Sequence, residues 1–282
     1  MTDALATVPA PAVRVLTSQL AALGVRPGQD LLVHCSMRRI GLVDARSIGV
    51  LPALLEAIGP DATLVVPCQT TANSTSSDVF SAATAGLNET ELASYMASMP
   101  GFDPERTPSQ GMGILAELVR TSPGAARSAH PQSSFAAIGA RAAESMAGHK
   151  LTSHLGEESP LGWLYRADAA VLFLGVGYDI CTAFHLAEYR LPGKAPRRPY
   201  TCFTVNQGVR REHTFTDICL DDTDFEDVGA LLDAEPFVSR GFVGSAECRL
   251  FPIRAAVDFA TAWPPFLHRR RIRDADPGEL AN

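Results

Sequence analysis

The chain has 282 residues, of which 46% are hydrophobic and 20% charged, and its net charge is −7. This composition excludes intrinsic disorder and allows either one large α/β domain or a core with a smaller lobe. The sequence contains no run of about 18 apolar residues and no signal-peptide pattern, so we expect a cytoplasmic protein with no membrane and no nucleic-acid partner.

The first part of the sequence alternates helical and strand patterns. An amphipathic pattern predicts a helix over residues 11–23, and an apolar run predicts a strand over 31–35. A second helix is expected over 44–58 and a second strand over 63–66. Because both strand segments are apolar throughout and are separated by a helix, we expect them to be buried and parallel.

The middle of the chain is richer in polar residues. The segments 68–88 and 100–110 are expected to form long loops, which in compact domains are usually functional or mobile. A helix is predicted over 113–120, followed by a loop over 127–134 and a further helix that ends near residue 147. Another polar loop then precedes the next apolar strand.

The most apolar strand pattern covers residues 169–175 and is followed by the turn Gly175-Val176-Gly177 and a helix over 182–190. In α/β sheets, ligands bind outside the carboxyl ends of the strands. Residues just after Gly177 therefore occupy a position that favours chemistry.

The last third of the chain is expected to contain a hairpin over 200–215, an acidic helix, a strand pair and a closing helix. Eight acidic residues and no lysine or arginine occur over 217–235; they are interpreted as a solvated surface, or alternatively as a rim that attracts a polycation. The arginines over 269–273 are interpreted as a solvated terminus. We expect one domain over 1–282, with a core over about 10–195 and an acidic C-terminal portion over about 196–268.

The cysteines indicate no disulfide framework and no zinc site, because they are scattered and include no CxxC pair. Most of them are interpreted as buried thiols. The six are Cys35, Cys68, Cys181, Cys202, Cys219 and Cys248.

A histidine and a glutamate lie three residues apart in the helix that follows Gly177. His185 and Glu188 therefore share one helix face, where the carboxylate can hold one imidazole nitrogen and stabilise the imidazolium. Such a pair suits a general base. By its spacing alone it is more often an ordinary surface contact, and it does not separate a base from a metal ligand.

Four motifs occur in order along the first 190 residues of the chain. They read LLVHCSMRRIGLV (31–43), TPSQGMGILAE (107–117), RSAHPQSSFAAIG (127–139) and LFLGVGYDICTAFHLAEYR (172–190). Together they resemble the aminoglycoside 3-N-acetyltransferases and related antibiotic N-acetyltransferases. The resemblance implies the layered α/β/α core of that family with a smaller C-terminal α+β portion, and direct transfer of acetyl from acetyl-CoA to an amine.

The resemblance also implies residue roles. His185 corresponds to the general base of the family and Glu188 to the glutamate that orients it. The residues expected to bind coenzyme A are Ser36, Met37, Arg38, Gly41, Met112, Gly113, Ser134, Phe135 and Ala136. The residues expected to bind the acceptor are Asp179, Thr70 and Thr182. For Ser134 to Ala136 and for the glycines beside Met112, tight packing by small residues is the other interpretation, and Asp179 could instead cap its helix.

The expected partners are acetyl-CoA and a small-molecule amine, a cationic antibiotic, with no metal and with a homodimer left open. The acceptor is expected to be the 3-amino group of an aminoglycoside, or alternatively the amine of another antibiotic or biosynthetic intermediate. Arg38-Arg39, Gly41-Leu42 and Gln110 depart from the residues that the family resemblance leads us to expect. These departures leave the acceptor open.

The sequence leaves three alternatives to this interpretation. Cys181 lies one helical turn before His185 and could act as a thiolate nucleophile. A metal-dependent hydrolase would need further ligands beside His185 and Glu188. A binding module that only sequesters its ligand would not need the pair of His185 and Glu188.

Overall fold

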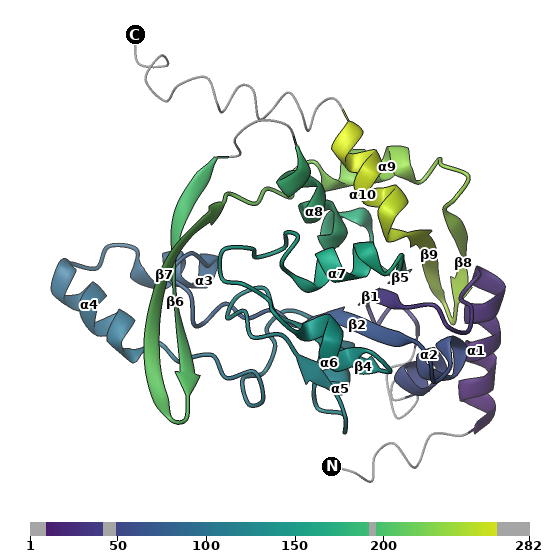
Figure 1. Cartoon of the computed structure of the whole chain (residues 1–282), viewed down its shortest axis with the longest axis horizontal. Helices are drawn as coiled ribbons and strands as arrows, with labels where there is room; N and C mark the ends of the chain where they lie inside the picture. Colours follow the sequence, from purple (N-terminus) through teal and green to yellow (C-terminus); the bar gives the residue numbers. More distant parts are fainter. Residues whose placement is uncertain (1–9, 42–48, 192–195, 264–282) are drawn as a thin grey trace.

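A computed structural model of the chain describes residues 10–41, 49–191 and 196–263, and a seven-stranded mixed sheet lies at its centre (Figure 1). The strands lie in the order β3-β4-β2-β1-β5-β9-β8. β1 is parallel to both β2 and β5, whereas the outer strands are antiparallel to their neighbours. The strands are β1 (Leu31–Cys35), β2 (Thr63–Pro67), β3 (Ala126–Arg127), β4 (Phe135–Gly139), β5 (Ala170–Leu174), β8 (Ser239–Val243) and β9 (Ala246–Pro252). The prediction of buried, parallel first strands is confirmed.

Helices cover both faces of the sheet, because the strand side chains alternate between two hydrophobic clusters. Leu31 and Val33 belong to the cluster under α1, α2 and α5, whereas Leu32 belongs to the cluster under α6 to α10. The helices are α1 (Ala10–Leu23), α2 (Val50–Ile58), α5 (Gly113–Arg120), α6 (Ala142–Met146), α7 (Pro160–Arg166), α8 (Thr182–Arg190), α9 (Phe225–Leu232) and α10 (Ile253–Ala262). The layered α/β/α fold is confirmed.

Three local predictions were wrong or incomplete. The helix expected over 44–58 is described from Val50, and residues 42–48 lie outside the described residues. The polar segment over 68–88 contains the short helix α3 (Asp78–Thr84), which Ser77 caps by accepting from the Phe80 N–H. Strand β4 replaces the first part of the helix expected before residue 147, because its apolar residues pair with β2 in the centre of the sheet.

A long hairpin extends from the sheet on the side opposite α1, next to α3 and α4 (Glu89–Ser98) (Figure 1). It consists of β6 (Arg197–Asn206) and β7 (Val209–Ile218). Its turn is formed by Gln207 and Gly208, both with positive φ. The pairing of the two strands confirms the predicted hairpin. The strand pair β8–β9 was also predicted, but β9 pairs with β5, so the C-terminal portion completes the central sheet.

A buried polar cluster joins the hairpin to the core. The Asp217 carboxylate accepts from the backbone N–H of His154 at 2.9 Å and from the Tyr189 hydroxyl at 2.7 Å. Its Oδ2 also lies 2.7 Å from His154 Nδ1. His154 in turn packs against the ring of His130, which contacts His149. The acidic segment over 217–235 therefore begins with a structural carboxylate.

None of the described helices is both long enough and apolar enough to cross a membrane.

Candidate active site

A cavity of about 550 Å³ opens at the carboxyl ends of the parallel strands. We call it the central cavity. It is lined by the last residues of β1 and β2, by the start of α5, and by residues that follow β5 as far as His185. This is the position at which α/β sheets bind ligands. His185 lines the cavity here, in the segment after Gly177 where functional residues were expected from the sequence.

His185 and Glu188 form a close pair beside this cavity. The imidazole Nδ1 lies 2.6 Å from Glu188 Oε2, and the other carboxylate oxygen, Oε1, accepts from the Asp221 backbone N–H at 2.9 Å. Glu188 is 4% exposed, so solvent screens this interaction little. The ring of His185 also packs against Phe225, with centroids 4.7 Å apart. The pair is therefore held from both α8 and the start of α9, and its geometry suits a general base.

The glycine turn before α8 is required by close packing. Gly175 has a φ of 68°, and a Cβ at this position would lie 2.8 Å from the Cβ of Arg39. Arg39 donates from Nη1 to the Gly175 carbonyl oxygen at 3.2 Å. The loop after β1 and the turn after β5 therefore fix each other, because the Arg39 side chain contacts Gly175.

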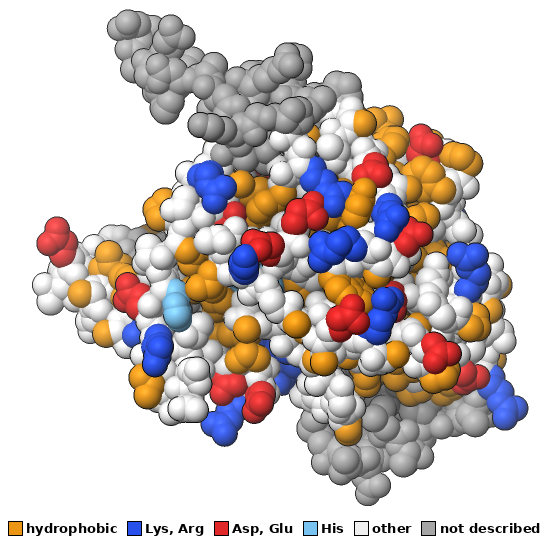
Figure 2. Space-filling model, in the orientation of Figure 1, with side chains coloured by type: hydrophobic (Ala, Val, Ile, Leu, Met, Phe, Trp, Pro, Cys, Tyr) orange, Lys and Arg blue, Asp and Glu red, His pale blue; other side chains and the backbone are white. Residues whose placement is uncertain are grey.

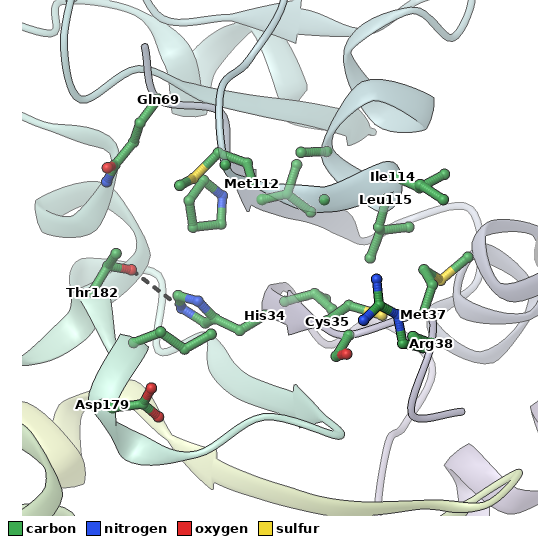
Figure 3. A pocket seen from close by; sticks show the side chains of 18 of the residues that line it. His34, Cys35, Met37, Arg38, Gln69, Met112, Ile114, Leu115, Asp179 and Thr182 are labelled. Carbon is green, nitrogen blue, oxygen red and sulfur yellow. Dashed lines mark hydrogen bonds between the residues drawn. The ribbon is translucent and has the colours of Figure 1, made fainter. Parts of the chain in front are cut away.

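The two ends of the central cavity differ in chemistry, as Figure 3 shows. Met37 and Arg38 lie at one end, whereas Asp179 and Thr182 lie at the other. Ser36 also lines the cavity, directly after β1. A cationic end with an exposed guanidinium suits phosphate groups, and an end with carboxylates suits a cationic acceptor.

The start of α5 forms the wall that faces His34 and Cys35 across the cavity (Figure 3). Met112 and Gly113 belong to this wall, and within the described chain no side chain caps the helix at Met112. An uncapped helix start presents backbone N–H groups, and the apolar side chains of Met112 and Ile114 suit an extended apolar arm.

The carboxylates at the end of the cavity near Thr182 come from two segments. Asp179 follows β5, and Asp222 belongs to the acidic segment; both side chains are exposed and line the cavity. Asp233, by contrast, is engaged by Arg249 at 2.8 Å and by Arg240 at 3.3 Å. On the face shown in Figure 2, acidic and basic side chains are intermixed. Within the acidic segment over 217–235, Asp222 is the acidic residue that lines the described cavity.

Several residues expected to bind ligands lie outside the described lining of the central cavity. These are Gly41, Ser134, Phe135, Ala136 and Thr70. Phe135 and Ala136 are fully buried because β4 pairs with β2, and the Ser134 hydroxyl donates to the Cys68 carbonyl oxygen. Thr70 is 3% exposed. For Ser134 to Ala136, the structure thus favours the packing interpretation over contact with a ligand.

Cys181 does not have the environment of a nucleophile. Its side chain is fully buried in the hydrophobic core, and burial raises the pKa of its thiol to about 12. A thiolate at that position would be strongly disfavoured at neutral pH. Among the described residues, no group of three or more His, Cys, Asp or Glu side chains is arranged to hold a metal ion.

From the sequence, no site role was assigned to several residues that line the central cavity, among them His34, Asp222 and Phe225. His34 gives a detectable signal, because a polar residue interrupts an otherwise apolar strand pattern. Asp222 and Phe225 come from the C-terminal portion, and their positions depend on long-range packing against α8.

Comparison with known proteins identifies close relatives. The profile of the family described as aminoglycoside 3-N-acetyltransferase matches residues 32–264. A prophage-derived aminoglycoside N(3')-acetyltransferase-like protein of Bacillus subtilis, YokD, is 37% identical over 88% of this chain and 90% of its own length. Aminoglycoside N(3)-acetyltransferase III of Pseudomonas aeruginosa is 33% identical over 88% of this chain and 91% of its own length.

Solved structures of similar proteins carry ligands. AAC-IIIb in a binary complex with CoASH superposes with a TM-score of 0.77 at 28% identity, covering 89% of this chain and 95% of that one. AAC-VIa bound to sisomicin superposes with a TM-score of 0.76 at 31% identity, covering 88% and 95% of the two chains.

Proposed function

The chain belongs to the aminoglycoside 3-N-acetyltransferase family, and on this premise we propose that it transfers acetyl from acetyl-CoA to the 3-amino group of an aminoglycoside, with His185 as general base. The observation that carries the proposal is the His185–Glu188 pair at the carboxylate-lined end of a cavity whose other end presents Arg38. We place this reaction in the cytoplasm.

Each substrate has matching groups in the central cavity. Acetyl-CoA supplies the activated acyl group; its phosphates would be held by Arg38 and Ser36, and its apolar arm by Met37 and Met112. These side chains fit, since a guanidinium binds phosphate and thioethers pack on apolar chains. Asp179 would accept an ammonium group of the acceptor at the other end. Solved relatives with CoASH and with sisomicin bound support the two classes of ligand.

The mechanism follows from the geometry of the pair. An amine must lose a proton as its nitrogen bonds to the acyl carbon, and the imidazole of His185 takes it. The Glu188 carboxylate at 2.6 Å stabilises the imidazolium that results, and the Asp221 N–H keeps the carboxylate in place. The imidazolium then returns the proton to the departing thiolate.

A screen for thiol release from acetyl-CoA tests the proposed function. We expect thiol release with aminoglycosides that carry a free 3-amine, and none with matched compounds in which this amine is absent or blocked. Other amine antibiotics are included, because the departures at Arg38-Arg39 and Gln110 bear on the acceptor. Turnover with the other amine antibiotics alone would mean that the acceptor is not an aminoglycoside. No turnover with any amine would refute the proposal.

Neutralising Asp222 should weaken capture of a polycationic acceptor. Exposed charge pairs contribute about 0.2–1 kcal/mol each, so Asp222→Asn should raise KM for the acceptor by a factor of about 1.4 to 5. The effect should shrink at high ionic strength, and KM for acetyl-CoA should stay constant. Asp227→Asn is the matched control, since Asp227 is an exposed residue of the same acidic segment outside the described cavity lining. An equal increase in KM for both variants would mean that the overall charge of the segment, and not Asp222 in particular, attracts the acceptor.

A further inference from the structure

A hydroxyl and a buried imidazole meet next to the catalytic histidine. Thr182 Oγ1 lies 3.2 Å from His34 Nε2, and both residues line the central cavity (Figure 3). Thr182 is the first residue of α8, three positions before His185. Residues at this spacing lie on one helix face with Cβ atoms about 5–6 Å apart, so the hydroxyl and the general base flank the same region of the cavity.

His34 is built to be a neutral partner. It is 5% exposed and its ring meets the Phe173 ring edge-on, with centroids 5.4 Å apart. Burial lowers the pKa of His34 to about 3, so the ring carries one N–H at neutral pH. When that hydrogen is on Nε2, the ring donates to Thr182 Oγ1 and leaves the hydroxyl hydrogen for an acceptor in the cavity.

We propose that the Thr182 hydroxyl is a catalytic residue that donates a hydrogen bond to the acyl oxygen as negative charge develops there, and that His34 is the residue that positions it. The inference rests on the proposed acetyl transfer. The amine nitrogen bonds to the acyl carbon while an electron pair moves to the acyl oxygen. That pair returns as the carbon–sulfur bond breaks, and the proton taken by His185 passes to the sulfur.

Two arguments favour Thr182 over the second hydroxyl and the carboxylates of the cavity. The described lining contains two hydroxyl side chains, Thr182 and Ser36; Ser36 directly follows β1 in the loop of Arg38, whereas Thr182 begins α8. The nearby Asp179 and Asp222 carboxylates have no hydrogen to donate when ionised. A donor that is already fixed by a buried partner is also preorganised, which is the property that makes such hydrogen bonds effective in a transition state.

Thr182→Val and Thr182→Ser separate the hydroxyl from the side-chain volume. Loss of one such donor costs about 10²-fold in kcat. We therefore expect that Thr182→Val lowers kcat by about this factor with little change in either KM, and that Thr182→Ser restores kcat to within several-fold of wild type. The position of the acid limb in the pH profile of kcat should not move, because His185 is retained.

A double-mutant cycle tests the positioning role of His34. His34→Leu removes the N–H and should lower kcat in the wild-type background, whereas in the Thr182→Val background it should have little further effect. His34→Gln, whose amide can still donate, should retain more activity than His34→Leu. Thermal unfolding and calorimetric titration with coenzyme A check that each variant is folded and binds the donor.

The outcomes distinguish this inference from the proposed function. An active wild type with an equally active Thr182→Val variant overturns the role of Thr182 and leaves acetyl transfer intact. Additive losses in the cycle overturn the positioning role of His34. A wild type that transfers acetyl to no amine refutes both.

Discussion

Replacing His185 by glutamine should lower kcat by about 10²- to 10⁴-fold, because general-base assistance to proton transfer has this magnitude. Glutamine keeps an N–H that can donate to Glu188, so the carboxylate, which is 4% exposed, is not left buried without a partner. The loss of activity then reports the missing base. KM for acetyl-CoA should change little, since the expected phosphate contacts lie at the other end of the cavity.

Companion variants sharpen this expectation. Glu188→Gln keeps a group that can accept from the Asp221 N–H but removes the charge that stabilises the imidazolium, so it should lower kcat less than the change at His185. His213→Ala is the matched control, because His213 bonds to Thr204 on the hairpin and lies outside the described cavity lining. Added imidazole should partly restore His185→Gly. A fully active His185→Gln enzyme would contradict the general-base role.

The parts of the fold that could be predicted from the sequence are those with a local signal. The strand over residues 170–174 follows from an uninterrupted apolar run, the helix over 182–190 was expected after the glycine turn that ends this strand, and the hairpin turn follows from Gly208. Strand β4 was missed because FAAIG is short and carries no helix or strand preference strong enough to decide. Its pairing with β2 makes this segment a strand, and that pairing joins residues 135–139 to residues 63–67, which are distant in the sequence.

The candidate site divides in the same way. His185 and Glu188 could be predicted because both lie on one helix, and their pairing depends on spacing alone. Asp222 reaches the cavity through a loop that Glu188 anchors at the Asp221 N–H, a contact between segments 33 residues apart. The role of Gln110 also depends on a contact between distant segments. Its side-chain oxygen accepts from the backbone N–H groups of Thr71 and Ala72 and so fixes the loop after β2.

The free energy of unfolding should fall steeply as the pH drops from about 6.5 toward 4.5. Burial lowers the pKa of His34 to about 3, that of His149 to about 4 and that of His130 well below its ordinary value. In the unfolded chain each would titrate near 6.5. Within this window the unfolded state therefore binds up to three more protons than the folded state, which corresponds to a slope of about 4 kcal/mol per pH unit near pH 5.

Urea unfolding at pH 7, 6 and 5 measures this slope, and single substitutions apportion it. His149→Gln removes one of the three protonation sites and should reduce the slope by about 1.4 kcal/mol per pH unit. Carboxylates with lowered pKa values, such as that of Glu117 at about 2, lose their stabilising charge at lower pH and do not obscure the window. A flat profile between pH 7 and 5 would mean that the buried imidazoles gain protons without unfolding. His34 would then carry a positive charge beside Thr182 in the folded protein.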